Sequence, residues 1–132
     1  MAKPPTSHDF EAAARLREAL RTFQRHSDEA STAAGLTSRT YQLLLMVKTA
    51  RAGNGQASLR ELEERLQLGK STVTELVSRT EKRGLVRREL DRGRPGAIFV
   101  RLTAAGERRL AAVVGELGDE RKRLTEVLSN LR

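Results

Sequence analysis

The stretch that decides the fold runs from Ser58 to Thr103 and reads SLRELEERLQLGKSTVTELVSRTEKRGLVRRELDRGRPGAIFVRLT. Ser58 and Glu61 are spaced as a helix capping box, and three leucines follow on one helical face. A short turn leads to a second predicted helix over residues 70–83. Gly84 ends that helix, because glycine readily adopts the left-handed conformation found at helix C-termini. The spacing therefore predicts two short helices joined by a tight turn.

Two strands are predicted directly after these helices. They cover residues 85–89 and 97–102, and the second is rich in β-branched and aromatic side chains. The loop between them, LDRGRPG, has the glycines and proline of a hairpin tip and carries Arg92 and Arg94. A further short strand is expected at residues 56–58. The predicted fold class is mainly α with a small β-wing, a winged helix-turn-helix.

The second helix of this stretch has one apolar and one polar face. At 100° per residue its inner stripe consists of Val73, Leu76, Val77 and Thr80. The polar face carries small hydroxyl groups, which can approach base edges in a DNA major groove, and cations, which suit phosphates. With the two arginines of the hairpin tip, the residues expected to bind DNA are Lys70, Ser71, Thr72, Thr74, Glu75, Ser78, Arg79, Lys82, Arg92 and Arg94.

Glu75 is the exception on this polar face, because a carboxylate repels phosphate. It has two interpretations. It could accept a hydrogen bond from cytosine N4, or it could pair with Arg79 one helical turn further on. We favour the pairing, since helix neighbours meet whatever the DNA sequence is.

The charge of the chain also indicates a polyanionic partner. The 132 residues include 25 Lys or Arg and 17 Asp or Glu, a net charge of +8. Nine of the cations and four of the acids lie between Gly69 and Arg101, so the excess is concentrated in the predicted reading region. This distribution favours nucleic acid, although an arginine-rich composition alone would give a similar bias.

The chain is predicted to be one domain, residues 7–132, after a loose tail at residues 1–6. Its winged-helix lobe covers residues 36–102, with Thr37 capping a buried central helix. A first helix over residues 7–34 is expected to start with Ser7 as its N-cap and to stop at Gly35. At 1.5 Å per residue it would be about 40 Å long, more than the lobe needs.

The C-terminal segment, residues 103–132, has leucines at intervals of seven. Two glycines interrupt the repeat, so we expect two helices or a kink, with Asp119 capping the second piece. The stripe fits a packing face within one chain about as well as a dimer seam. Together with the long first helix, it predicts a dimerisation layer containing Phe10, Leu16, Leu20, Leu110, Leu117, Leu124, Leu128 and Leu131.

Other classes of function find little support in the residues. The chain has no cysteine, and His8 and His26 lie eighteen residues apart without a third ligand at metal spacing. No nucleophile has a nearby base, so we expect no enzyme, no cofactor and no metal. No segment is apolar over the length of a bilayer, and we expect a cytoplasmic protein without a membrane partner.

Three strings, AGLTSRTYQLLL, LRELEERLQLGKSTVTELVSRTEKRGLVRR and IFVRLTAAGE, resemble the MarR family of winged helix-turn-helix transcriptional regulators. The resemblance is close over residues 36–107 and general at the terminal helices. The chain departs from the family pattern at Thr80, where leucine is usual. It also has Pro95 and Gly96 where the wing usually carries paired arginines.

The resemblance implies a homodimer held by the N- and C-terminal helices. It places the helix that begins at Lys70 in the major groove of a pseudo-palindromic operator and the wing, residues 91–96, on the minor groove. It also implies a sequence-specific regulator, typically a repressor, that responds to a small, often aromatic, molecule. The alternative hypothesis is a winged-helix module that binds protein or RNA without recognising an operator.

Overall fold

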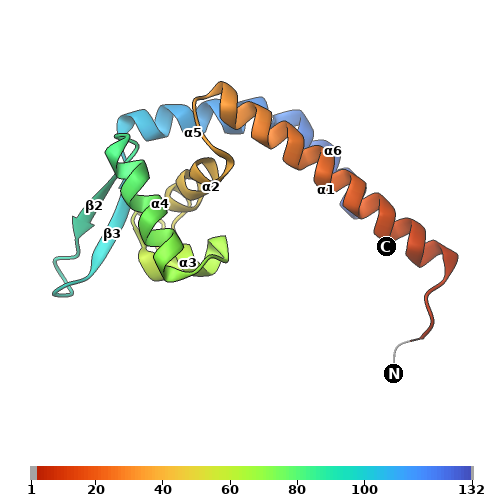
Figure 1. Ribbon diagram of the computed structural model, residues 1–132, viewed down its shortest axis with the longest axis horizontal. Helices are drawn as coiled ribbons and strands as arrows, with labels where there is room; N and C mark the ends of the chain where they lie inside the picture. The colour runs from red at the N-terminus through yellow and green to blue at the C-terminus, as the bar shows by residue number, and fades with distance from the viewer. Residues whose placement is uncertain (1–2, 132) are drawn as a thin grey trace.

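The computed structural model describes residues 3–131, and helices account for most of them (Figure 1). In chain order the elements are α1 (Ser7–Ala33), α2 (Ser38–Lys48), β1 (Ala57–Ser58), α3 (Leu59–Leu66), α4 (Lys70–Lys82), β2 (Val86–Leu90), β3 (Ile98–Leu102), α5 (Ala104–Glu116) and α6 (Gly118–Ser129). The predicted fold class, mainly α with a small wing, is confirmed. The first two residues of the expected tail lie outside the described part.

The sheet is antiparallel, with β3 between β1 and β2. Val86 pairs with Leu102 at the base of the β2–β3 hairpin, and Leu90 pairs with Ile98 near its tip. β1 adds one short pairing, Ala57 with Val100, on the other side of β3. The short strand expected before α3 is therefore present, and it ties the helix-turn-helix to the wing.

The core of the lobe forms around α2. Leu43, Leu44 and Val47 are completely buried there, as the run of apolar residues in this helix predicts. Val73 of α4 and Val100 of β3 are also completely buried and belong to the same cluster. One apolar core therefore fixes α4 and the wing relative to each other.

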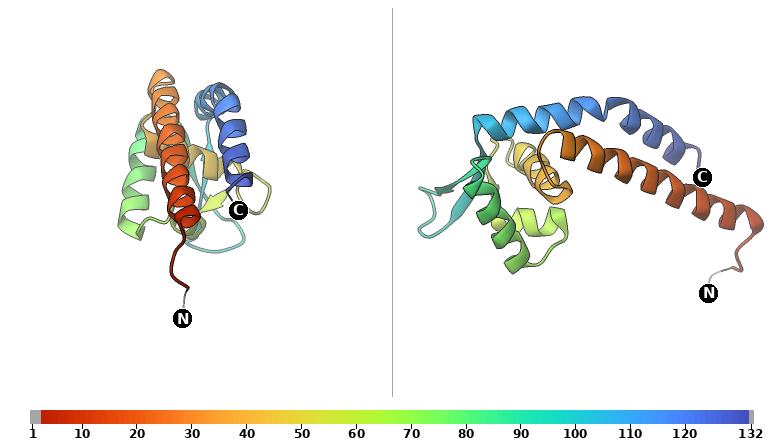
Figure 2. Two further views of the ribbon diagram at one scale, coloured as in Figure 1. Left: turned by 90° about the vertical axis from the view of Figure 1, so that its right-hand side faces the viewer. Right: turned by 45° about the horizontal axis from the view of Figure 1, so that its top comes forward.

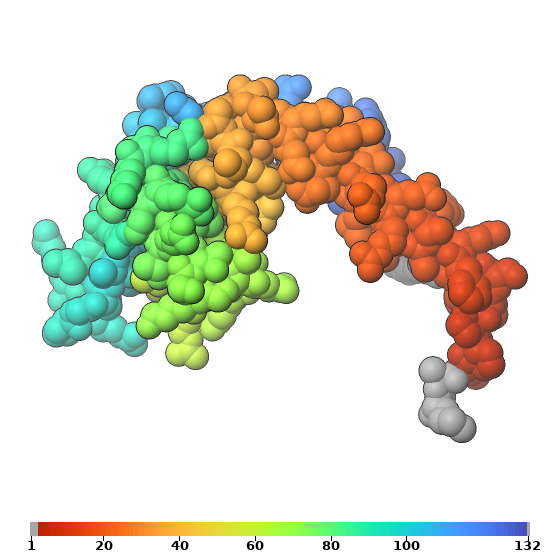
Figure 3. Space-filling view, in the orientation of Figure 1, coloured from red at the N-terminus to blue at the C-terminus, as the bar shows by residue number. Residues whose placement is uncertain are grey.

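The terminal helices form a separate layer above the lobe. α5 leaves the base of the wing and crosses the lobe, and α6 then runs beside α1 and away from it (Figure 2). The N-terminal half of α1 stands clear of the lobe, so the molecule has the shape of an arch in the space-filling view (Figure 3). No helix within residues 3–131 combines the length and apolar character needed to span a membrane.

Two predicted helix caps are wrong. Thr6, not Ser7, caps α1, because its hydroxyl accepts from the Asp9 amide at 3.2 Å while its own amide donates to the Asp9 carboxylate at 2.8 Å. Asp119 does not cap α6, which starts at Gly118 with Leu117 as its N-cap residue and no side-chain cap. The α5–α6 break is so short that Arg121 of α6 reaches back to the Val114 carbonyl at 2.8 Å.

The capping box expected at α3 is only half formed. Ser58 accepts from the Glu61 amide at 3.1 Å, as predicted. The Glu61 carboxylate does not return to Ser58; it accepts from the Arg51 amide at 2.9 Å and from Arg65 at 3.0 Å. Arg65 also donates to the Thr49 carbonyl at 3.0 Å, so this network fastens α3 to the C-terminal end of α2.

The heptad stripe also needs correction. Leu110 and Leu117 lie in the intramolecular core, only 4% and 2% exposed, and have little surface left for a partner. Leu128 is 46% exposed, and Leu124 and Leu131 are half-buried. The repeat thus serves the chain's own packing in α5 and faces outward only along α6.

Candidate nucleic-acid interface

α4 is held rigidly on its inner side. Its predicted inner stripe, Val73, Leu76, Val77 and Thr80, is buried. Thr80, which replaces the usual apolar residue, satisfies its hydroxyl by donating to the Leu76 carbonyl at 2.7 Å. The tight turn before α4 uses Gln67 in the left-handed conformation, at φ 55°. The helix-turn-helix predicted from the sequence is therefore formed and firmly seated.

The outer side of α4 brings the predicted residues together on one face. Lys70, Ser71, Thr74 and Glu75 line a shallow depression on the first turns. The remaining predicted residues follow along the helix, with Thr72 and Ser78 half-buried and Arg79 and Lys82 exposed. Small polar groups therefore come first, and cations lie toward the C-terminal end.

Two of these side chains have partners within the protein. Glu75 Oε1 lies 4.0 Å from Arg79 Nε, which is the helix pairing that we favoured from the sequence. Ser78 Oγ accepts from the guanidinium of Arg88, which lies on β2. Sequence reasoning did not anticipate the Ser78 contact, because helix periodicity does not show which strand residue faces α4.

The tip of the wing is a structured turn. The Asp91 carboxylate accepts from the Gly93 amide at 2.8 Å, and the Asp91 amide donates to the Ala97 carbonyl at 2.9 Å. Arg92 and Arg94 are exposed on this turn. The fold therefore places both predicted wing arginines at the end of the hairpin, beside the lobe surface that carries α4 (Figure 1).

Ion pairs join the base of the wing to neighbouring elements. Arg101 of β3 lies 3.4 Å from Glu89 of β2, and Gln56 donates to the same carboxylate at 3.3 Å. Arg88 lies 3.4 Å from Glu81 of α4. Arg88 and Glu81 were not among the residues predicted from the sequence, although the turn at Gly84 that brings β2 back toward α4 could have indicated that they meet.

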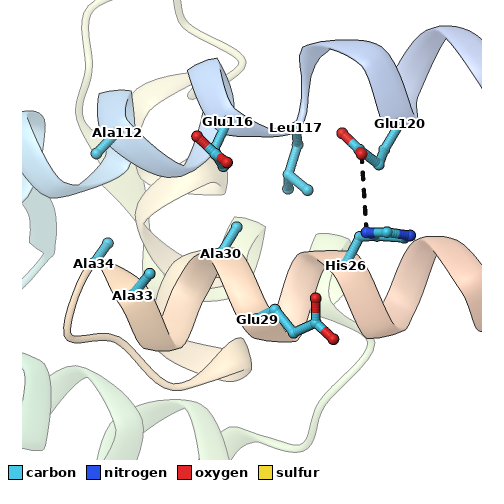
Figure 4. Close-up of a pocket in the computed structure, with 9 residues that line it drawn as sticks. All are labelled: His26, Glu29, Ala30, Ala33, Ala34, Ala112, Glu116, Leu117 and Glu120. Atoms are coloured by element: carbon cyan, nitrogen blue, oxygen red, sulfur yellow. Dashed lines mark ion pairs between the residues drawn. The ribbon is translucent and has the colours of Figure 1, made fainter.

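A separate hollow lies between α1 and the junction of α5 and α6 (Figure 4). Its floor is made of alanines and Leu117, and its rim carries Glu29, Glu116 and Glu120. His26 of α1 reaches across to Glu120, with 3.8 Å between His26 Nδ1 and Glu120 Oε1. Three carboxylates around one hollow disfavour an anionic ligand there. Within residues 3–131 no group of three or more His, Cys, Asp or Glu side chains could hold a metal ion.

Tyr41, the single tyrosine of the chain, lies under the terminal helices. Burial raises the pKa of its phenol, and the positive charge of Arg121 opposes that rise. The phenol is therefore neutral across the physiological range and contributes packing and a hydroxyl rather than charge.

The architecture defines a winged helix-turn-helix protein with a helical terminal layer. Residues 34–94 match the model of the MarR family. The transcriptional regulator HosA of Escherichia coli is 50% identical over 50 residues, which are 38% of this chain and 36% of HosA. The segment that matches the family model contains the helix-turn-helix and part of the wing. The chain spans only about a third of the length of the curated relative.

Solved structures extend the likeness to the terminal helices. A MarR family protein from Bacillus stearothermophilus is 26% identical with a TM-score of 0.71, over 92% of this chain and 80% of that one. Sco3205, a MarR family transcriptional regulator from Streptomyces coelicolor solved in complex with DNA, is 22% identical with a TM-score of 0.75, over 93% of this chain and 77% of that one. The helix-turn-helix and part of the wing therefore match the MarR family model, and the fold of the whole chain is similar to that of solved MarR family proteins.

Proposed function

We propose that the protein is a sequence-specific, DNA-binding transcriptional regulator. The observation that carries the proposal is that α4, whose outer face is rich in hydroxyl groups, lies in the same lobe as a hairpin whose tip carries two exposed arginines. Such a pair suits a major groove and its neighbouring minor groove. The DNA complex of the related Sco3205 supports the same assignment.

The proposed roles follow from side-chain chemistry and exposure. Ser71, Thr72 and Thr74 lie on the first turns of α4 and read base edges. Glu75 pairs with Arg79 and reduces the positive charge at the centre of the outer face of α4. The phosphate contacts come from the cations of α4, and the wing contacts the minor groove. These contacts involve Lys70, Arg79, Lys82, Arg92 and Arg94, and Ser78 lies on the same face with its hydroxyl bound by Arg88.

The proposal includes a homodimer formed by the terminal helices. Phe10 and Leu20 on α1 are 66% and 42% exposed, and Leu128 on α6 is 46% exposed. Large apolar side chains that recur along one layer favour burial against a partner. Two lobes joined by these helices in a dimer bind a pseudo-palindromic operator whose half-sites lie about one helical turn apart, or a multiple of it.

Repression and ligand response complete the proposal. A dimer seated on an operator blocks transcription simply by occupying the site. The hollow between α1 and the α5–α6 junction supports a small-molecule response, because a ligand there would change how α1 packs against α5 and α6 within the terminal layer. Its carboxylates favour a neutral or cationic molecule over an aromatic acid. Action on chromosomal DNA places the protein in the cytoplasm.

The test is selection of bound duplexes from a random pool, followed by titration of the winning duplex at several salt concentrations. Arg94→Ala should weaken all duplexes and reduce the salt slope by about one unit. Arg17→Ala, which removes the same charge from an exposed position on α1, is the matched control and should leave the slope unchanged. An unchanged slope for Arg94→Ala removes the wing from the proposal.

Base reading by α4 requires a separate variant. Thr74→Ala should change which duplexes win the selection, whereas Thr32→Ala, at an exposed threonine on α1, should not. A uniform loss across sequences would contradict base reading by Thr74. If wild-type protein selects no duplex but retains RNA or a protein, the alternative hypothesis of an interaction module replaces the proposal.

A further inference from the structure

Arg88 occupies the junction between the recognition helix and the wing. Side chains alternate between the two faces of a strand, so Arg88 shares a face of β2 with Val86, which is 1% exposed, while Arg87 projects from the opposite face. The Val86 face is the one that covers the core and looks toward α4. Arg88 is therefore directed at the helix, although Arg87, its neighbour in sequence, is not.

The contacts of Arg88 hold it in a bracket formed by α4. Its amide donates to one oxygen of Glu81 at 3.1 Å, and its Nε lies 3.4 Å from the other oxygen. One terminal nitrogen, Nη2, donates to the hydroxyl of Ser78. Ser78 and Glu81 lie three residues apart on α4, so they are neighbours on its surface. The guanidinium is fixed from two sides.

The same guanidinium is not sealed from solvent. The Arg88 side chain is 32% exposed, and that of Glu81 is 39% exposed. A guanidinium has five N–H donors, of which one on Nη2 donates to Ser78, while the buried Nε lies near Glu81 without a hydrogen bond. Donors therefore remain that can face a ligand lying across the junction.

When a winged helix binds duplex DNA, one part of the DNA always lies at this junction. The major and minor grooves are separated by one sugar–phosphate backbone. If α4 enters the major groove and the β2–β3 hairpin enters the adjacent minor groove, that backbone must pass between the two elements. The residues that face it are those where α4 meets β2, namely Ser78, Glu81 and Arg88.

We propose that Arg88 binds the phosphate of the strand that passes between the two grooves, and that Glu81 and Ser78 act as positioning residues for it. The inference rests on the proposed DNA-binding function. Because the bracket is formed without DNA, the guanidinium is oriented before binding and loses little side-chain freedom on contact. The same contacts fix the wing relative to α4, so that α4 and the wing reach the major and minor grooves at the same time.

Removing the Glu81 carboxylate distinguishes a positioning role from a simple effect of charge on DNA binding. A carboxylate close to a phosphate opposes binding by simple electrostatics, so removing it should strengthen binding if charge alone matters. If Glu81 orients Arg88, removing it should weaken binding instead. The two accounts predict opposite signs for one substitution.

The first experiment titrates a fluorescent duplex, chosen by selection from a random pool, against full-length protein at several salt concentrations. Arg88→Gln should lower affinity by about tenfold, as expected for a hydrogen bond to a charged group, and reduce the salt slope by about 0.9. Arg87→Gln is the matched control, with the same charge change on the opposite face of the same strand. It should leave affinity within about twofold of wild type. Equal effects of the two substitutions would overturn the proposal.

The second experiment uses Glu81→Gln, Ser78→Ala and Arg88→Lys with the same duplex. Each should weaken binding by about three- to tenfold, typical of coupling within one network, and Glu81→Gln should do so without lowering the salt slope. Arg88→Lys keeps the charge but cannot reach both partners and phosphate at once. Stronger binding by Glu81→Gln would overturn the positioning role.

Thermal unfolding of each variant shows whether a binding loss is a folding loss. If Arg88→Gln does not fold, Ser78→Ala decides, because it leaves the Glu81–Arg88 pair intact. Failure of the proposed function has a different signature. Wild-type protein would then bind no duplex even at low salt, whereas failure of this inference leaves wild-type binding strong and Arg88→Gln no weaker than Arg87→Gln.

Discussion

The lobe and the terminal layer differ in how much of their apolar surface a single chain buries. In the lobe, α2, α4 and the sheet contribute side chains that are almost fully buried, such as Leu43, Val73 and Val100. In the terminal layer, the buried residues of α1 lie in its last two turns, Ser27–Ser31, and α6 has no buried residue among those described. The lobe and α5 share one closed core, whereas α1 and α6 leave apolar surface for another molecule.

The largest expected effect tests how much the buried core around α2 contributes to the free energy of unfolding. Leu43→Ala empties a completely buried position and should lower the free energy of unfolding by about 3 kcal/mol, from lost burial and the cavity left behind. Leu90→Ala, at a leucine that is 76% exposed on the wing, should change it by less than about 0.5 kcal/mol. Denaturant titration measures both. Equal losses would show that the described core does not carry the stability.

The next effect lies at the border between the two regions. A Cβ added at Gly106 of α5 would lie 2.1 Å from the Leu85 carbonyl oxygen, so backbone must move to admit it. Gly106→Ala should therefore destabilise the protein by about 2 kcal/mol.

Gly115, on the same helix, provides the control for that substitution. Among residues 3–131, no atom apart from the adjacent residues and the helix's own backbone lies within 4 Å of a Cβ added there. Gly115→Ala should therefore stabilise the protein by about 0.5–1 kcal/mol through helix propensity. Opposite shifts in thermal midpoint are expected from the same change on one helix. Destabilisation of similar size at both positions would mean that α5 does not seat against the wing base through Gly106.

The sequence was a good guide wherever a local pattern sets the structure. The stop at Gly84, the cap at Thr37 and the buried stripe of α4 depend on neighbours within a few residues, and all are confirmed. Misplaced caps had a different cause. Ser7 and Thr6 are both good capping residues, and only the position of Asp9 three residues after Thr6 decides between them.

Long-range contacts explain most of what the sequence did not predict. The Arg88 bracket joins a strand to a helix, and the partners of Glu61 come from a different loop and from its own helix. Periodicity gives the face on which a side chain lies but not the element that meets it. For the same reason a heptad spacing could not show that Leu110 and Leu117 pack within their own chain.

The unfilled surface of the terminal layer gives the third prediction. Leu20→Glu together with Leu128→Glu puts charge on exposed apolar positions of α1 and α6, and should weaken self-association by about tenfold or more. Sedimentation should then show single chains at concentrations where wild type forms dimers, with an unchanged thermal midpoint for the lobe. Leu90→Glu, at a still more exposed leucine on the wing, is the control and should leave the mass unchanged. A monomeric wild type would contradict the dimer.

The smallest effect is at the far end of the terminal layer, where α1 begins beyond the reach of the lobe. Hydrogen bonds from the Thr6 backbone and side chain hold the pKa of Asp9 below its usual value. A depressed carboxyl pKa stabilises the helix start at neutral pH, and this contribution is lost as pH falls through the folded pKa, below 3.8. Thr6→Ala should lower the stability of the first turn of α1 by about 1 kcal/mol at neutral pH, measured as faster amide exchange there. Ser7→Ala should leave this exchange unchanged. Because residues 7–10 of this turn are exposed, the melting of the lobe should be unaffected. If a dimer buries this turn, Thr6→Ala should also shift the distribution of mass between dimers and single chains.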